Sequence, residues 1–289
     1  MNWHEYDERL IRRGELILDL DFVKNYKAEL DAMNKGNEGK RFTLTGSYVQ
    51  FLALVRYLYG MPYRQLEGFT RALKRFVEVP SADYTSLRDR VIRVDVEPFR
   101  DLARLDEPLT IAIDSTGVKI HKSGGWMERT YGKKKRCVKV HFAVNVKTKE
   151  VVGMEVTTDE VHDSKVAERL VDGAATRGDV KEVIGDGAYD TARLYEHLHN
   201  RGIDAVIKPR RNSILNTPSR ARQYHVDLYR NLGYRSWAAI KGYGRRWSVE
   251  TAYSTFKRVF GEPVMAKTLD NVVRELMAKV SLYNILVRI

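Results

Sequence analysis

Three acidic residues stand at points where a fold could bring their carboxylates together. Asp114 follows the apolar run of residues 111–113 and Asp186 closes the segment EVIGD, so we expect each at the end of a buried strand. Glu250 lies in a segment with helical periodicity. Carboxylates from three separate elements suit Mg²⁺ or Mn²⁺, and two such ions about 3.5 to 4 Å apart can activate an attacking oxygen and stabilise a leaving one. Singly, each aspartate would more often be a cap or a turn residue, but together the three predict a two-metal site for phosphodiester chemistry.

The segment around Glu250, YGRRWSVETAYSTFKRVFGE, carries four polar side chains at helical spacing. At about 100° per residue they fall within a sector of about 60°, so one helical face is predicted to present them. These residues are Tyr243, Arg246, Glu250 and Lys257. An adjacent apolar sector, predicted to anchor the helix to a sheet, contains Val249, Ala252, Phe256 and Phe260. The alternative is a solvated helix in which Arg246 and Glu250 form an ion pair worth only about 0.2 to 0.5 kcal/mol.

The elements that must position these residues follow a definite order from residue 109 onward. An apolar strand, LTIAIDSTGVKI, precedes a hairpin formed by CVKVHFAVNVK and EVVGMEVTT. The following segments alternate between helices and short strands, and Gly202 is expected to end one of the helices. This order predicts an α/β fold over residues 106–289, with a ribonuclease H-like mixed sheet and flanking helices.

Residues 1–105 show helical periodicity and few strand-like alternations, so we predict an all-helical, DNA-binding N-terminal region. Within it, two short helices separated by the break VPSADY resemble a helix-turn-helix over about residues 62–93. The residues that would then lie on or beside DNA are Tyr84, Thr85, Ser86, Arg88 and Arg90. An ordinary helical bundle is the alternative, because most helix pairs with short turns do not bind DNA.

The charge of the chain points to a polyanionic partner. Its formal net charge is +12, a balance that favours nucleic acid. One basic loop, which also contains Trp126 and Tyr131 for stacking on unpaired bases, carries Lys133, Lys134, Lys135 and Arg136. A second basic run follows a strand and contains Arg210 and Arg211. Both are predicted to contact DNA, and a solvated basic loop is the alternative for each.

Other features narrow the class of protein. Cys137 is the only cysteine, which excludes an intramolecular disulfide and a cysteine-based zinc site. The first residues lack the apolar core of a signal peptide, and no apolar run approaches the roughly 20 residues that span a bilayer. We therefore predict a soluble protein inside the cell, without a membrane partner.

Some titratable residues are not assigned to the metal. His141 lies inside a predicted strand, where a histidine of the core or surface is the commoner state. Asp163, which follows His162, is expected to cap a helix. Asp190 is expected either to shape the site or to cap the helix that follows it.

Taken together, these segments resemble the DDE transposases of bacterial and archaeal insertion sequences, most closely the insertion-sequence-five and insertion-sequence-four groups. Residues 243–257 reproduce the signature Y-x2-R-x3-E-x6-K without a gap, and IAIDSTG and GDGAYD look like the segments that carry the two aspartates. The segments NWHEYDERLIRRGE, PYRQLEGF and DYTSLRDR also look like this family, so the resemblance covers nearly the whole chain. No long strand-rich run separates Asp186 from Glu250, which indicates that the large β insertion of some relatives is absent.

The resemblance implies a function as well as a fold. The implied ligands of two Mg²⁺ or Mn²⁺ ions are Asp114, Asp186 and Glu250, and the implied contacts to transposon-end DNA are Tyr243, Arg246 and Lys257. Water would free a 3′-hydroxyl at a terminal inverted repeat of double-stranded DNA, and that hydroxyl would attack target DNA. A homodimer in the DNA complex and a prokaryotic cytoplasmic, nucleoid-associated setting are implied too. Two alternatives stay open: a transposase-derived DNA-binding protein that no longer cuts, and a ribonuclease H-like nuclease that does not join strands.

Overall fold

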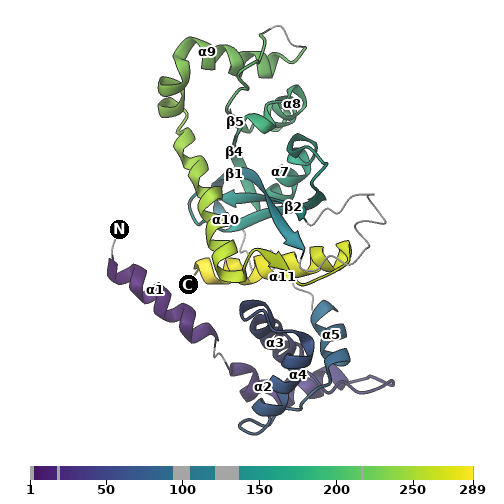
Figure 1. Cartoon of the computed structure of the whole chain (residues 1–289). Coiled ribbons are helices and arrows are strands. Elements are labelled where there is room, and N and C mark those ends of the chain that lie inside the picture. The colour runs from purple at the N-terminus through teal and green to yellow at the C-terminus, as the bar shows by residue number, and fades with distance from the viewer. Residues whose placement is uncertain (1–2, 18–19, 94–104, 121–136, 216–217, 289) are drawn as a thin grey trace. The chain divides into compact units, whose positions relative to one another are not determined.

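A computed structural model of the 289-residue chain describes residues 3–17, 20–93, 105–120, 137–215 and 218–288 (Figure 1). The chain divides into two compact units. One unit consists of Met1–Pro98 with Leu269–Val287 and Ile289, and the other consists of Phe99–Thr268 with Arg288. The sequence predicted a domain boundary near residue 105, and that boundary stays a prediction.

All the regular elements described in the first unit are helices, joined by turns and loops. Its elements are α1 (Trp3–Ile17), α2 (Asp21–Asn34), α3 (Gly46–Leu58), α4 (Tyr63–Leu73), α5 (Tyr84–Arg93) and most of α11 (Leu269–Arg288). The helices α4 and α5 are the pair expected over residues 62–93, and they bury Leu66 and Leu87. Thr70 fixes the connection between them, because its hydroxyl accepts a hydrogen bond from the Ala82 N–H at 3.2 Å. The predicted all-helical region is therefore confirmed, whereas its role in DNA binding stays a prediction.

The second unit is built on a mixed sheet. Its strands are β1 (Leu105–Ile120), β2 (Cys137–Asn145), β3 (Val151–Thr158), β4 (Gly178–Gly185), β5 (Asp204–Ile207) and β6 (Pro263–Val264). They are arranged in the order β3-β2-β1-β4-β5, and β6 pairs with β1. The first three strands are antiparallel, whereas β4 pairs parallel to β1 and β5 parallel to β4. This is the ribonuclease H-like order predicted from the sequence.

The alternation of side chains along β1 gives the sheet two different faces. Ile111 and Ile113 contribute to a hydrophobic cluster with α7 (Ala167–Ala175) and α8 (Ala192–Asn200). The intervening residue Ala112 and the residue two positions later, Asp114, point to the opposite face. That face is covered by α10 (Trp247–Phe260) (Figure 1). The residues of α10 that were predicted to anchor it, Val249, Ala252, Phe256 and Phe260, are all buried. Asp114 therefore faces α10 because it lies an even number of residues from Ala112.

Between β5 and α10, the described residues contain the long helix α9 (Arg220–Ile240) and no strand. Gly233 interrupts α9 with a φ of 68°, so the helix is kinked at that residue. The sequence predicted no long strand-rich insertion before Glu250, and the described residues of this interval form the helix α9 instead. Within the described ranges, no helix has both the length and the apolar character needed to cross a membrane.

Gly153 offers a test of the packing between β3 and α7. A Cβ at this position would approach the Leu170 carbonyl oxygen to 2.8 Å and the Ala143 Cβ to 3.1 Å. Gly153→Ala should therefore lower the free energy of unfolding by about 1–3 kcal/mol, because backbone would have to shift. Gly173→Ala is the matched control, since it lies exposed on α7 with open space around its Cβ position and alanine favours helix. Urea unfolding followed by circular dichroism measures both, and equal effects would contradict the close approach.

Candidate active site

Asp114 lies in the middle of β1, not at its end as the sequence predicted, because β1 continues to Ile120 and pairs with β2 as far as Lys119. The parallel partner β4 stops earlier, and its last pairing with β1 joins Ile184 to Ala112. Extending that register by two residues places Asp186 beside Asp114. The edge on which the two carboxylates meet is therefore created by the end of β4 rather than by the end of β1.

The groups around Asp114 have opposite effects on the pKa of its carboxyl. Burial raises the pKa of the Asp114 carboxyl, the Ser115 N–H and the Arg246 guanidinium lower it, and Asp186 and Glu250 raise it further. The net pKa lies above the ordinary value of an aspartate. The Ser115 N–H donates to Asp114 Oδ1 at 2.8 Å. Nearby carboxylates and partial burial thus disfavour the charged form of Asp114, a cost that a cation in this place would relieve.

Arg246 provides such a positive charge within the chain itself. Its guanidinium donates to Asp114 Oδ2 at 3.2 Å and also to the Glu250 carboxylate. The predicted ion pair between Arg246 and Glu250 is present, but Arg246 also contacts a strand residue that is far away in the sequence. Across the described residues, no three His, Cys, Asp or Glu side chains are grouped closely enough to hold a metal ion.

Asp186 follows β4 directly and caps the 3-10 turn η2 (Gly187–Tyr189), since its side chain accepts from the Ala188 N–H at 2.8 Å. The sequence suggested that its two neighbouring glycines allow a sharp backbone turn. Neither of them adopts a positive φ. Gly185 instead leaves room for a ring, because a Cβ there would lie 3.2 Å from Tyr189 Cδ2.

The signature residues do not all lie on one α-helix, so this part of the prediction is wrong. Tyr243 and Arg246 belong to the 3-10 turn η3 (Tyr243–Arg246), and α10 begins only at Trp247. Arg245 fixes η3 to β4 by donating to both carboxylate oxygens of Glu182, at 2.6 and 2.8 Å. Gly242, which precedes η3, has a φ of 59° and leaves space for the Arg245 side chain. Arg246 therefore reaches Asp114 from a short turn that is held against the sheet.

The other two signature residues lie beside the carboxylates. Tyr243 is buried, and burial raises the pKa of its phenol to about 12, with Asp186 and Asp114 among its charged neighbours. Lys257 Nζ donates to Thr116 Oγ1 at 2.8 Å, on the same face of β1 as Asp114. The structure thus brings Tyr243, Arg246 and Lys257 to one face of β1, together with the three acidic residues.

Tyr253 is a site residue that the sequence analysis missed. Its buried hydroxyl donates to the Asp114 carbonyl at 2.7 Å, lies 3.1 Å from the Val140 carbonyl, and accepts from the Phe142 N–H at 2.9 Å. Its ring stacks on Phe142 with 4.6 Å between centroids. Because Tyr253 lies one turn after Glu250 on α10, this hydroxyl sets the position of Glu250 relative to Asp114. In the sequence Tyr253 reads only as an aromatic core residue, so no local signal reveals its polar contacts.

A cationic pocket of about 720 Å³ opens beside Asp186. Its lining includes the predicted residues Arg210 and Arg211 together with Tyr243 and Arg246. Other cationic and aromatic side chains at the pocket are Lys208, Arg230 and Tyr229. The structure therefore joins the second predicted basic run to the carboxylate edge, in an arrangement suited to a phosphate-bearing ligand.

Asp190 holds this pocket in place and does not cap α8, which Thr191 caps. Its carboxylate accepts from Arg222 Nε at 2.7 Å and from the Arg210 N–H at 2.9 Å. Burial raises the pKa of Asp190, but hydrogen bonds from Arg222, Ser213 and Arg210 outweigh burial and leave the pKa below its ordinary value. Asp190 thus stays ionised and ties the backbone of Arg210 to α9.

The remaining predicted DNA contacts lie either in the helical unit or outside the described residues. Arg88 lies in α5 of the helical unit, where its exposed guanidinium contacts Asp89 at 3.1 Å. The basic residues Lys133, Lys134, Lys135 and Arg136 lie outside the described residues, as do Trp126 and Tyr131.

Comparison with known protein families identifies the family of this chain. Two family models, each described as a transposase DDE domain, match residues 106–285 and residues 11–123. The first match spans more than half of the chain and contains Asp114, Asp186 and Glu250. The chain belongs to the DDE transposase family. The resemblance seen in the sequence is thereby confirmed at the level of the family, and the protein is a DDE-type transposase enzyme.

Among solved structures, this transposase is similar to the piggyBac transposase, as seen in a cryo-EM structure of its synaptic complex with hairpin DNA. The two share 12% sequence identity and a TM-score of 0.41, with 95% of this chain and 73% of that chain covered. No residue role follows from a likeness of this degree.

Tyr253→Phe tests how strongly the transposase depends on the hydroxyl between β1 and β2. Loss of the hydroxyl leaves the buried Phe142 N–H without its acceptor, so the free energy of unfolding should fall by about 1–3 kcal/mol. Tyr224→Phe is the control, because the Tyr224 side chain is 63% exposed and its hydroxyl can bond to water. Denaturant titration of both variants gives the comparison, and a loss no larger than that of the control would show that the buried contacts contribute little.

Proposed function

We propose that this transposase cleaves double-stranded DNA at the terminal inverted repeats of an insertion sequence and joins the freed 3′-hydroxyl to target DNA. The observation that carries the proposal is that Asp186 and Glu250 both lie near enough to Asp114 to raise the pKa of its carboxyl, beside a pocket lined by arginines. Three carboxylates with an adjacent cationic pocket combine a place for divalent ions with a place for a phosphate backbone.

Asp114, Asp186 and Glu250 are the proposed ligands of two divalent ions, Mg²⁺ or Mn²⁺. Their donor set fits such ions, because all three supply hard carboxylate oxygens from different elements, and Asp186 and Glu250 both act electrostatically on Asp114. When bound, the ions activate the attacking oxygen and stabilise the leaving oxygen of a phosphodiester. Arg246 must first release its contacts with Asp114 and Glu250 for these oxygens to serve as ligands.

The released Arg246 then has a second use in the proposed reaction. Its side chain lines the pocket beside Asp186, so a guanidinium that leaves the carboxylates can grip a DNA phosphate with two hydrogen bonds. Lys257, on the same face of β1, offers a point charge farther along the strand. These two cations orient the scissile phosphate so that an oxygen attacks phosphorus in line with the bond that breaks.

Each of the two proposed steps forms one P–O bond and breaks another, so neither step needs a cofactor that supplies energy. In the first step the oxygen of water bonds to phosphorus, the bond from phosphorus to the 3′-oxygen breaks, and that oxygen leaves as a hydroxyl with one proton. In the second step the new 3′-hydroxyl attacks a target phosphodiester and displaces another 3′-hydroxyl. Both ends of an element must be joined at one target, so we propose that two copies of the chain act together on DNA.

Substitution of the three acidic residues tests the proposal directly. Asp114→Asn, Asp186→Asn and Glu250→Gln should each lower the rate of DNA cleavage by roughly 100-fold or more, because the charge that holds the ions is lost. Glu196→Gln is the control, since Glu196 is exposed on α8. The assay uses Mg²⁺ or Mn²⁺ with duplex DNA that carries the inverted repeats flanking the gene, and it resolves nicked from joined products.

The products distinguish the proposed function from its alternatives. Joined strands that depend on Asp114 support a transposase that completes strand transfer. Nicks without joints would replace it with a nuclease, and tight binding without cleavage would replace it with a DNA-binding relative. Wild-type cleavage retained by Glu250→Gln would remove Glu250 from the chemistry.

Arg211→Ala tests the cationic pocket separately from the carboxylates. Arg211 is exposed at the rim of the pocket, so its loss should weaken binding to any duplex sequence and reduce the slope of log affinity against log salt by about 1. Lys181→Ala is the matched control, because Lys181 is an exposed cation in the first half of β4, away from the strand end that carries Asp186. Fluorescence anisotropy across a salt series measures both slopes. An unchanged slope for Arg211→Ala would place the DNA elsewhere.

A further inference from the structure

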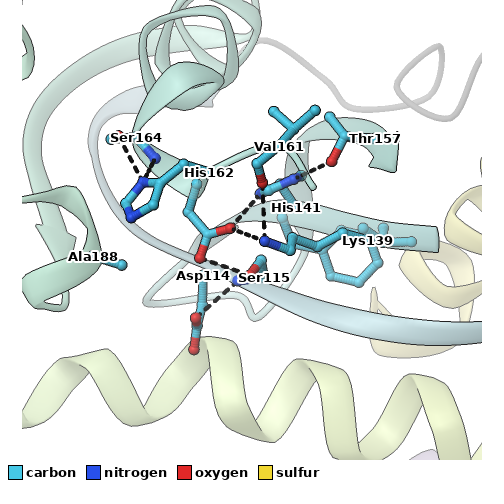
Figure 2. A network of polar contacts seen from close by, with 12 residues as sticks. Asp114, Ser115, Lys139, His141, Thr157, Val161, His162, Ser164 and Ala188 are labelled. Atoms are coloured by element: carbon cyan, nitrogen blue, oxygen red, sulfur yellow. Dashed lines mark hydrogen bonds and ion pairs between the residues drawn. The ribbon is translucent and has the colours of Figure 1, made fainter. Parts of the chain in front are cut away.

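A polar cluster lies on the α7 side of β1, directly behind Asp114 (Figure 2). We call it the Asp163 cluster, and its members are Ser115, Lys139, His141 and Asp163. Ser115 pairs with His141 in the ladder between β1 and β2, so their side chains share one face. Figure 2 shows the Asp114 carboxylate pointing away from Lys139 and His141.

Asp163 is the centre of this cluster. It accepts from the Ser115 hydroxyl at 3.0 Å through Oδ2 and from Lys139 Nζ at 2.9 Å through Oδ1. His141 Nδ1 lies 3.9 Å from Asp163 Oδ1, but burial lowers the pKa of His141 to about 4, so the imidazole is neutral near pH 7. Lys139 therefore supplies the charge that balances Asp163.

The predicted role of Asp163 as a helix cap is wrong. Asp163 was expected to cap a helix, yet the residue that caps the 3-10 turn η1 (Asp163–Lys165) is His162, whose side chain accepts from the Ser164 N–H. The Asp163 carboxylate is thereby left to reach across to β1 and β2. Its partners Ser115 and Lys139 are 48 and 24 residues away in the sequence.

Ser115 connects this cluster to the proposed chemistry. Its backbone N–H donates to Asp114 Oδ1, and its hydroxyl donates to Asp163 Oδ2. One residue thus holds a carboxylate on each face of β1. A continuous chain of hydrogen bonds runs from Lys139 through Asp163 and Ser115 to Asp114.

The surroundings of the cluster argue against simple packing. On the same face, Ile111, Ile113 and Ala143 belong to the hydrophobic cluster under α7, and the face becomes polar only beside Asp114. Within the described residues, two buried polar atoms here have no hydrogen-bond partner: His141 Nδ1 and the Tyr189 hydroxyl, whose nearest charges include Asp163 and Asp114. Buried polar groups of this kind cost stability relative to an apolar core, so their presence next to Asp114 points to a functional reason.

We propose that Asp163 is a positioning residue for Asp114, acting through Ser115 to fix the carboxylate orientation that binds a divalent ion. The inference rests on the proposed role of Asp114 as a metal ligand. Asp163 does not touch the metal or DNA in this scheme. It sets the orientation of Ser115, whose N–H in turn selects the Asp114 rotamer, in the way that outer hydrogen-bond partners orient metal ligands.

Isothermal titration of the full-length chain with Mn²⁺ alone tests the proposal without relying on activity. Asp163→Asn should weaken Mn²⁺ binding by about 10- to 100-fold, the range found when outer partners of metal ligands are removed. Asp172→Asn is the matched control. Asp172 lies in α7 and also contacts a histidine and a cation, His197 at 2.8 Å and Arg201 at 3.0 Å, but these partners are in and directly after α8, not in β1 or β2. Its Mn²⁺ affinity should equal that of the wild type.

A second pair of variants separates positioning from folding. Ser115→Ala removes the hydroxyl that contacts Asp163 and keeps the backbone N–H, whereas Ser115→Thr keeps both. Ser115→Ala should weaken Mn²⁺ binding, and Ser115→Thr should restore it, with thermal midpoints of the two variants measured alongside. This comparison holds even if Asp163→Asn does not fold.

The outcomes separate this inference from the proposed function. Mn²⁺ affinity that is unchanged in both Asp163→Asn and Ser115→Ala overturns the inference, whatever happens to thermal stability. Affinity that is equal in the wild type and Asp114→Asn overturns it as well, because no ion would then be bound at Asp114. Weakened Mn²⁺ binding in the Asp163 variant of a protein that neither cuts nor joins DNA would support the inference and reject the proposed function.

Discussion

Repulsion among three carboxylates at one edge of the sheet is the constraint on which the rest of this structure depends. Asp114 is partly buried, and Asp186 and Glu250 raise its pKa further, so the folded chain must supply compensation. Arg246 supplies a positive charge, and the Ser115 N–H supplies a hydrogen bond. A fold organised for stability alone would not gather these charges, because separating them would remove the repulsion. Their arrangement makes sense for an enzyme whose site is completed by cations from outside the chain.

The same edge needs rigid support from both faces of the sheet, and each face supplies it differently. On the α10 face, the Tyr253 hydroxyl is inserted between the backbones of β1 and β2 beside Asp114, and its ring stacks on Phe142. On the α7 face, Ser115 is held by Asp163 and Lys139. Asp114 is thus fixed through its carbonyl, its carboxylate and its neighbouring residue. Such support limits the ways in which the Asp114 carboxylate can move, as the proposed phosphodiester chemistry requires.

The cationic pocket beside Asp186 depends on a separate anchor. Asp190, four residues after Asp186, stays ionised against Arg222 and holds the backbone of Arg210. The proposed phosphate-binding cation Arg210 and the proposed metal ligand Asp186 are therefore linked through one short segment, residues 186–190. In the proposed reaction this linkage would place a phosphate near the acidic edge, and between β5 and α10 the described residues form a helix.

The order of strands and helices along the chain and the family could be predicted from the sequence alone, because apolar periodicity and the spacing of Tyr243, Arg246, Glu250 and Lys257 are local properties of the chain. Only the tertiary structure decided that Asp114 lies within β1 rather than at its end, since the edge there depends on where β4 stops pairing. It also decided that η3 breaks the expected helix before Trp247, and that Asp163 contacts Ser115 instead of capping a helix. These contacts join residues far apart in the chain, and local periodicity carries no information about which distant partner a polar side chain will meet.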